Sequence, residues 1–141
     1  MFLDASVLVA ASRSPSGGSA VSLEVCQGTK FRAAVTEEVL SEARVNVAGK
    51  FGDAELVRFY EQFAATEPLI VPPPPVSRIE ECEPLTTDKD AHVLAAAIEA
   101  GAAYLLTLDR RHLLNDRVIE ANLPVRVMTP RDFLQQIVRD T

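Results

Sequence analysis

The sequence is poor in residues that cross-link small proteins. Its 141 residues include two cysteines, Cys26 and Cys82, which stand far apart and form no Cys-x-x-Cys motif. This pattern excludes a disulfide scaffold and a zinc finger, and we expect two reduced thiols. A chain of this length buries enough surface to fold without a disulfide or a structural metal.

Long hydrophobic runs are also missing. The most apolar stretch, residues 91–108, contains Glu99 and is interrupted by Gly101, so it predicts a helix followed by a strand and not a membrane span. The first residues include Asp4 and no basic segment, which is not typical of a secretory signal. We therefore expect a cytoplasmic protein with no membrane partner.

Basic residues are outnumbered. The chain has 14 Lys and Arg against 20 Asp and Glu, a net charge of −6. This balance argues against a protein that coats nucleic acid by bulk electrostatics. It does not exclude a nuclease, because bound metal ions reverse the local sign of the field. The length predicts one domain over residues 1–141.

Short apolar runs alternate with segments of helical period. Val39, Ala43 and Val47, for example, lie on one face of a 3.6-residue repeat. The same spacing predicts helices over residues 6–12, 19–27, 36–48, 53–65, 88–100 and from 129 onward, with strands at 2–3, 31–35, 69–71, 104–108 and 125–128. A further helix is expected around Asp116. Four prolines at 72–75 predict a stiff connector. The alternation predicts an α/β fold whose mainly parallel sheet is covered by helices on both faces.

Four acidic residues stand where this fold would bring them together. Asp4 follows the first strand and Asp109 follows the fourth, and parallel strands end at the same edge of a sheet. Asp90 begins the helix that leads into the fourth strand. Glu42 lies beside the apolar Ala43, an awkward place for a charge unless it faces a polar cavity.

Each acid also has an ordinary explanation. Asp4 could cap the first helix, and Asp109 could form a turn. Asp90 could be a helix-start residue, a role for which Asp88 competes, and Glu42 could be a solvated flank residue. The joint pattern is more informative, because clustered carboxylates repel one another unless a cation such as Mg²⁺ or Mn²⁺ lies between them. A carboxylate cluster that holds such ions suits phosphodiester hydrolysis.

The sequence resembles a known protein family in four of its segments. Four segments are similar to the four motifs of PIN domains: Phe2–Val9, Thr36–Glu42, Asp90–Ala97 and Thr107–Asp109. The resemblance implies a three-layer α/β/α fold with a mainly parallel central sheet of four to five strands. It also implies a metal-dependent ribonuclease that uses Mg²⁺ or Mn²⁺. The catalytic and metal-binding acids that it implies are Asp4, Glu42, Asp90 and Asp109.

Small PIN domains of this length resemble the toxin half of VapBC-type toxin–antitoxin pairs. The resemblance therefore implies three partners: an RNA substrate, a cognate antitoxin protein and a second copy of the chain in a homodimer. The basic residues form no dense run, so a second subunit could complete an RNA groove.

The sequence departs from the usual motifs in two places. The first motif usually reads Asp-Thr-Asn or is similar to Asp-Ser-Ser, and here it is Asp4-Ala5-Ser6. We expect Ser6 and Thr107 to contact the acids or the substrate. A further acid is common after the fourth motif, where this chain has Arg110 and Arg111, which could hold RNA phosphates or simply be solvated. Fewer ligands are then left for a second metal ion. His112 is expected to be a surface residue.

Other classes of protein fit the sequence less well. A phosphatase with Asp4 as nucleophile would want a second aspartate where Ser6 stands, and neither glycine-rich nucleotide-binding motif is present. The remaining alternatives are a PIN-like nuclease that processes RNA and is not a toxin, and a degenerate PIN fold that only binds a partner.

Overall fold

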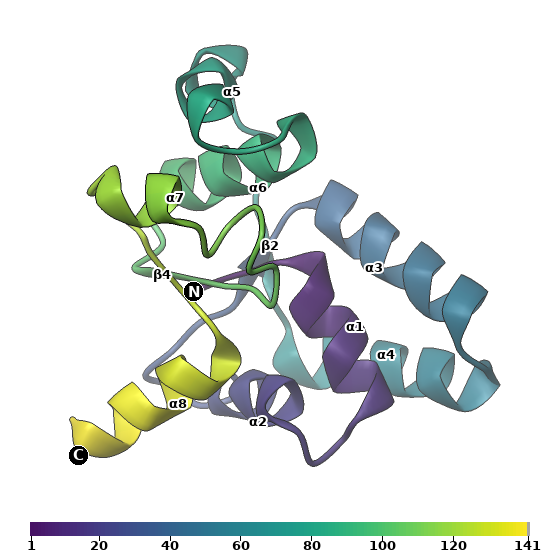
Figure 1. Cartoon of the computed structure of the whole chain (residues 1–141). Helices are drawn as coiled ribbons and strands as arrows, with labels where there is room; N and C mark the ends of the chain where they lie inside the picture. The colour runs from purple at the N-terminus through teal and green to yellow at the C-terminus, as the bar shows by residue number, and fades with distance from the viewer. Residues whose placement is uncertain (141) are drawn as a thin grey trace.

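The computed structural model describes residues 1–140 and contains five strands and eight α-helices within them (Figure 1). In chain order these are β1 (Phe2–Leu3), α1 (Ala5–Arg13), α2 (Gly18–Val25), β2 (Ala34–Val35), α3 (Glu37–Lys50), α4 (Asp53–Thr66), β3 (Leu69–Ile70), α5 (Val76–Cys82), a 3-10 turn η1 (Glu83–Leu85), α6 (Asp88–Glu99), β4 (Tyr104–Leu106), α7 (Asp116–Glu120), β5 (Arg126–Met128) and α8 (Pro130–Arg139).

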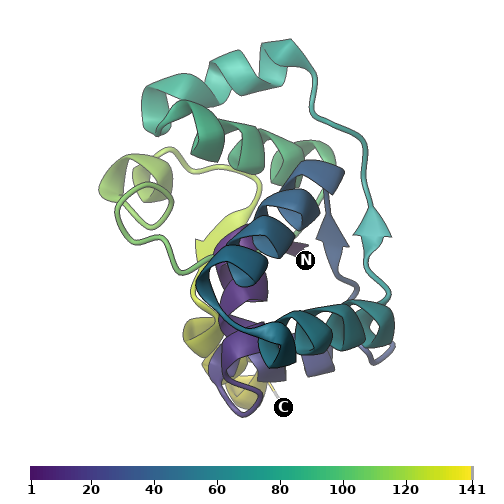
Figure 2. The same cartoon turned by 90° about the vertical axis from the view of Figure 1, so that its right-hand side faces the viewer.

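The five strands form one parallel sheet in the order β3-β2-β1-β4-β5. Strand β1 is central and pairs with β2 on one side and with β4 on the other. Figure 2 shows β2 and β3 side by side, running in the same direction. The chain leaves β1 toward β2 and β3 and then returns to the opposite side of β1 as β4 and β5. The strand order therefore reverses between β1 and β4, the place where parallel sheets carry ligand sites.

Helices lie on both sides of the sheet. In Figures 1 and 2, helices α5, α6 and α7 form one group, whereas α1, α2, α4 and α8 form another, and the sheet lies between them. The predicted α/β architecture with a mainly parallel sheet is confirmed. Among residues 1–140, no helix combines the length and the apolar character needed to cross a membrane.

Local signals explain most helix boundaries. The Thr36 hydroxyl accepts a hydrogen bond from the Val39 N–H (3.2 Å) at the start of α3, and Thr129 caps α8 through Asp132 in the same way (3.1 Å). Gly101 has a φ of 68°, the left-handed conformation expected of glycine at a helix end. The helices predicted from the spacing of apolar residues are confirmed, with boundaries that differ by one or two residues.

The core lies around the central strands. Phe2, Leu3, Leu105 and Leu106 are fully buried, as expected for strands covered on both faces. The expectation of covered strands is wrong for β3, because its Leu69 is 47% exposed at the open edge of the sheet. Cys26 and Cys82 are buried free thiols, in agreement with the expectation.

Helix α5 and the turn η1 are absent from the predicted elements. The four prolines form the connector, but Pro75 is also the residue that precedes the first turn of α5. Val76, Ile79 and Cys82 then follow at three-residue spacing, and Ile79 and Cys82 belong to the core while Val76 is exposed. Proline is common at the positions that precede or begin a helix. The prolines that end the extended segment therefore also lead into helix α5.

Candidate active site

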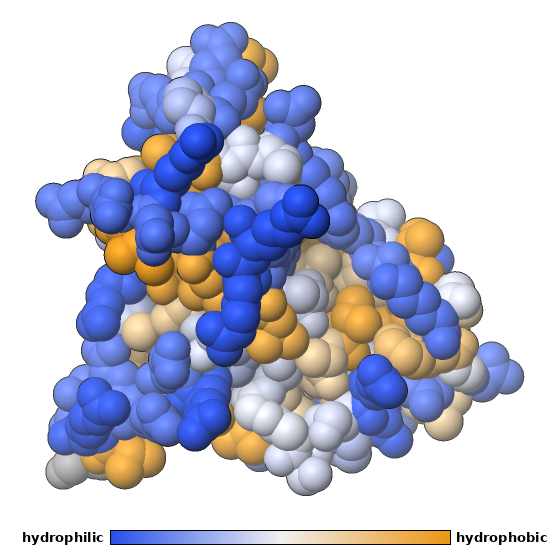
Figure 3. Space-filling model, in the orientation of Figure 1, coloured by the Kyte–Doolittle hydropathy of each residue, from blue (hydrophilic) through white to orange (hydrophobic). Residues whose placement is uncertain are grey.

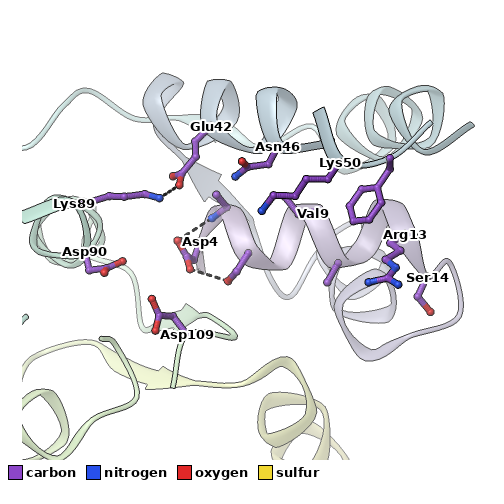
Figure 4. A pocket seen from close by; sticks show the side chains of 14 residues that line it. Asp4, Val9, Arg13, Ser14, Glu42, Asn46, Lys50, Lys89, Asp90 and Asp109 are labelled. Atoms are coloured by element: carbon purple, nitrogen blue, oxygen red, sulfur yellow. Dashed lines mark hydrogen bonds and ion pairs between the residues drawn. The ribbon is translucent and has the colours of Figure 1, made fainter. Parts of the chain in front are cut away.

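A groove of about 690 Å³ opens at the carboxyl ends of β1 and β4. All four predicted acids line it: Asp4, Glu42, Asp90 and Asp109. They come from four separate segments, namely the end of β1, helix α3, the first turn of α6 and the loop after β4. Figure 4 shows these side chains converging at one end of the groove. The fold therefore brings together residues that are up to about a hundred positions apart.

Asp4 is held by hydrogen bonds on both carboxylate oxygens. Its Oδ1 accepts from the Ala5 N–H (2.9 Å), and its Oδ2 accepts from the hydroxyls of Ser6 (2.7 Å) and Thr107 (2.8 Å). The Asp4 N–H donates to the Leu106 carbonyl (3.0 Å), which ties the end of β1 to β4. Asp4 is 6% exposed. Asp4 thus caps helix α1 and also lines the groove.

The two hydroxyls connect the first acid to the fourth. Thr107 Oγ1 accepts from the Asp109 N–H (3.0 Å), and Ser6 Oγ accepts from the Leu108 N–H (3.1 Å). Each hydroxyl donates to Asp4 and accepts from the loop after β4, so the position of Asp109 depends on that of Asp4. Ser6 and Thr107 therefore contact the acids, one of the two roles expected for them.

We expect Thr107→Val to weaken both the fold and any activity that depends on Asp4. Thr107 is fully buried, and the substitution removes one of the two hydroxyl hydrogen bonds to Asp4 Oδ2 and the hydrogen-bond acceptor of the Asp109 N–H, a loss of about 1–3 kcal/mol in the free energy of unfolding. Cleavage by the displaced acids should fall about 10- to 100-fold. Thr107→Ser is the control, since it keeps the hydroxyl. Equal urea midpoints for the valine and serine variants would contradict the assignment.

Burial and neighbouring charges both act on the ionisation of Asp90. Burial raises its pKa, an accepted hydrogen bond from the Thr87 hydroxyl (2.7 Å) opposes this, and the nearby carboxylates of Asp109 and Asp4 raise the pKa further. His112 acts in the opposite direction. A carboxyl group that is 7% exposed and faces two other acids is costly to ionise unless a cation is near.

Asp109 is fixed by its own loop. Its Oδ1 accepts from the N–H groups of Arg111 (3.1 Å) and His112 (2.9 Å), so it forms the turn suggested by the sequence as well as facing the groove. Its Oδ2 lies 3.3 Å from Nδ1 of His112, which in turn lies 3.5 Å from Oδ2 of Asp90. Asp90, Asp109 and His112 each offer a ligand atom within 4.8 Å of the other two.

Glu42 stands apart from this trio and is paired with a lysine. The ammonium group of Lys89, one residue before Asp90, forms an ion pair with Glu42 across the groove. Figure 4 shows Lys89 extending from the side of Asp90 toward Glu42. The groove thus already accommodates a cation beside its acids. Asp88, the alternative to Asp90, is exposed and does not line the groove.

The far end of the groove is basic. Arg13 and Lys50 line it, and the Arg13 guanidinium lies 5.3 Å from the centre of the Phe51 ring. Arg110 and Arg111, the arginines singled out from the sequence, are exposed and are not among the described residues that line the groove. Contact of Arg110 and Arg111 with RNA phosphates outside the groove stays a prediction.

A sequence signal for the basic end did exist. Glu42, Asn46 and Lys50 recur every four residues along α3, which places all three on one helix face. All three line the groove. Only Glu42 was predicted to belong to the site, because the basic residues of the sequence form no dense run.

The chemistry of the acidic end fits a hard divalent cation. Carboxylate oxygens are the ligands that Mg²⁺ and Mn²⁺ prefer. Burial and the nearby carboxylates of Asp109 and Asp4 raise the pKa of Asp90, so a bound cation would stabilise the ionised form of this acid. Asp90 and Asp109, with Asp4 beside them, are the residues that would hold the ion.

Two comparisons with known proteins bear on this site. No curated protein is significantly similar to the chain in sequence. A family model described as the PIN domain matches residues 1–111, which include β1 to β4 and all four acids. PIN domains are generally metal-dependent nucleases, in agreement with an acidic groove at the end of the sheet. The chain belongs to the PIN domain family.

Proposed function

We propose that the chain is an endoribonuclease that hydrolyses RNA phosphodiester bonds with Mg²⁺ or Mn²⁺, and that it is the toxin of a VapBC-type toxin–antitoxin pair. One observation carries the nuclease proposal: four acids from four segments of the chain line one groove at the point where strand order reverses. The catalytic and metal-binding roles of Asp4, Glu42, Asp90 and Asp109 belong to this proposal.

The acidic end of the groove suits the hydrolysis step of a nuclease, and the basic end suits contacts with the rest of the substrate. When bound, a divalent cation supplies an activated water molecule and neutralises charge on the attacked phosphate. Asp4, Asp90 and Asp109 hold that ion and fix the reaction centre, while Ser6 and Thr107 keep Asp4 in place. Because the acids are held by backbone and hydroxyl donors, they need little reorganisation before reaction.

The basic end suits the rest of the strand. Arg13 and Lys50 offer donors to phosphate groups one or more nucleotides away from the acids, and Arg13 is positioned by the Phe51 ring. In Figure 3, hydrophobic and pale residues lie between α1 and α3, beside the hydrophilic residues of the neighbouring surface. An apolar wall next to spaced cations supports a single-stranded substrate, whose bases are free to contact apolar side chains.

Protein partners form the finer part of the proposal. The exposed apolar side chains of α4 and β3, among them Val57, Tyr60 and Leu69, support contacts with an antitoxin and with a second copy of the chain. The Lys89–Glu42 pair supports inhibition by an antitoxin that offers a basic side chain to the same acids. The short chain and the four motifs support the toxin assignment.

The proposal is tested by incubating a mixed RNA pool with the purified chain in Mg²⁺, Mn²⁺ or EDTA. Wild type should cleave with either metal and stop with EDTA. Asp4→Asn should lower the cleavage rate at least 100-fold, because it removes the negative charge that Asp4 offers to the ion, while the amide oxygen of asparagine can still accept the two hydroxyl hydrogen bonds.

The outcomes separate the alternatives. Equal cleavage by wild type and Asp4→Asn, or cleavage in EDTA, would contradict the metal-nuclease proposal. Cleavage without growth arrest on expression, and without relief by the neighbouring gene's product, would favour an RNA-processing nuclease. Tight RNA binding with no cleavage in any metal would favour a degenerate binding module.

A further inference from the structure

We infer that the ring nitrogen of His112 is a ligand of the same metal ion and that it gives the site a preference for Mn²⁺ over Mg²⁺. This inference rests on the proposed function and extends it. His112 is the first residue beyond the segment matched by the PIN domain model, so the family match places no ligand there.

The geometry places the imidazole inside the acid cluster. Nδ1 lies 3.3 Å from Oδ2 of Asp109 and 3.5 Å from Oδ2 of Asp90, and the three ligand atoms lie within 4.8 Å of one another. Metal ligands that share one ion have such separations, because each lies about 2.0–2.3 Å from it. Glu42 does not belong to this trio and is paired with Lys89 instead. The imidazole of His112, and not the carboxylate of Glu42, is therefore the third ligand group beside Asp90 and Asp109.

Hydrogen bonds hold the backbone of His112 at both its N–H and its carbonyl. Its N–H donates to Asp109 Oδ1 (2.9 Å), and its carbonyl accepts from the hydroxyl of Thr86 and from Nδ2 of Asn115 (3.2 Å). Leu113, the next residue, is fully buried. The ring is only 36% exposed. These contacts distinguish it from His92, whose Nε2 pairs with Glu38 (3.2 Å).

A nitrogen donor changes which ion is preferred. Mg²⁺ prefers oxygen ligands and keeps an octahedral water shell, whereas imidazole suits the transition metals. The Nε2–H tautomer of neutral imidazole presents the Nδ1 lone pair to the cluster, so binding needs no charged form of the ring.

The test uses the purified full chain and Mn²⁺ alone, without RNA. Pulsed electron paramagnetic resonance of bound Mn²⁺ should show the modulation of a directly bound ¹⁴N nucleus. His112→Asn should abolish this modulation, because its amide can still donate a hydrogen bond to the carboxylates but has no imidazole lone pair. In calorimetric titrations the variant should lose about tenfold in affinity for Mn²⁺ and less than threefold for Mg²⁺. His92→Asn is the matched control, since these are the two histidines of the sequence.

Each result decides between defined alternatives. Tight Mn²⁺ binding without nitrogen modulation would overturn the ligand assignment and leave the nuclease proposal intact. Equal losses of Mg²⁺ and Mn²⁺ affinity in His112→Asn would show that His112 only positions the carboxylates. Absence of Mn²⁺ binding by wild type would overturn the metal-nuclease proposal together with this inference.

Discussion

Asp90→Asn should reduce RNA cleavage by at least 1,000-fold and at the same time raise the melting temperature of the metal-free chain. The loss of activity follows because Asp90 faces both Asp109 and Asp4 and its charge is needed to hold a cation among them. Several kcal/mol of transition-state stabilisation by a bound metal corresponds to about three orders of magnitude in rate. Cleavage of a defined RNA and thermal unfolding in EDTA measure the two effects.

The gain in stability follows from the direction of the pKa shift. Burial and the neighbouring acids raise the pKa of folded Asp90 above the ordinary value of 3.8. The folded chain therefore holds this proton more tightly than the unfolded chain. The resulting stability is fully present below the unfolded pKa and is lost as pH rises through the folded pKa. Asparagine stays neutral and still accepts from Thr87, so the variant keeps that stability at neutral pH.

Asp88→Asn is the control for both effects. Asp88 and Asp90 both lie in the first turn of α6, so both substitutions remove the same favourable interaction with the helix dipole. Only Asp90 lines the groove. The gain of Asp90→Asn over wild type should be about 1–3 °C at pH 7 and should vanish toward pH 3. A lower melting temperature for Asp90→Asn at every pH would contradict the assignment of unbalanced charge to this site.

The convergence of the acids was predictable from the sequence because it depends on topology. Asp4 and Asp109 each follow a short apolar run, and parallel strands end at one edge whatever the details of packing. Thr107 was predictable for the same reason, since it lies between β4 and Asp109. Residues at strand ends have their direction set by the strand itself.

Side chains that reach the groove from loops and helix flanks were harder to predict. Arg13 and Lys50 line the basic end and Arg110 and Arg111 do not, although only the latter pair is adjacent to an acid in sequence. His112 was expected on the surface, yet the turn formed by Asp109 directs its ring back toward the acids. Lys50 shares a helix face with Glu42, so its spacing along α3 did carry a signal. Arg13 reaches the groove through the packing of distant segments, for which spacing along the chain carries no signal.

Adding Mn²⁺ to the metal-free chain should raise its melting temperature by about 8 °C. An ion that binds only the folded state, at one hundred times its dissociation constant, stabilises by about 2.7 kcal/mol. For a chain of this length each 1 kcal/mol corresponds to about 3 °C. The ion should bind the folded chain well, because it compensates the two effects that raise the pKa of Asp90, namely its burial and the repulsion by Asp109 and Asp4.

The order of the melting temperatures of wild type and Asp90→Asn should reverse when Mn²⁺ is added. Without metal the variant should melt above wild type, because one buried charge has been removed. With Mn²⁺ wild type should melt above the variant, because only wild type keeps Asp90 and Asp109 as a pair of charged ligands beside His112. Asp88→Asn should follow wild type in both conditions. Parallel shifts of wild type and Asp90→Asn with Mn²⁺ would place the ion elsewhere on the chain. Since thermal unfolding needs neither an RNA target nor an antitoxin, it isolates the metal site from every other part of the proposed function.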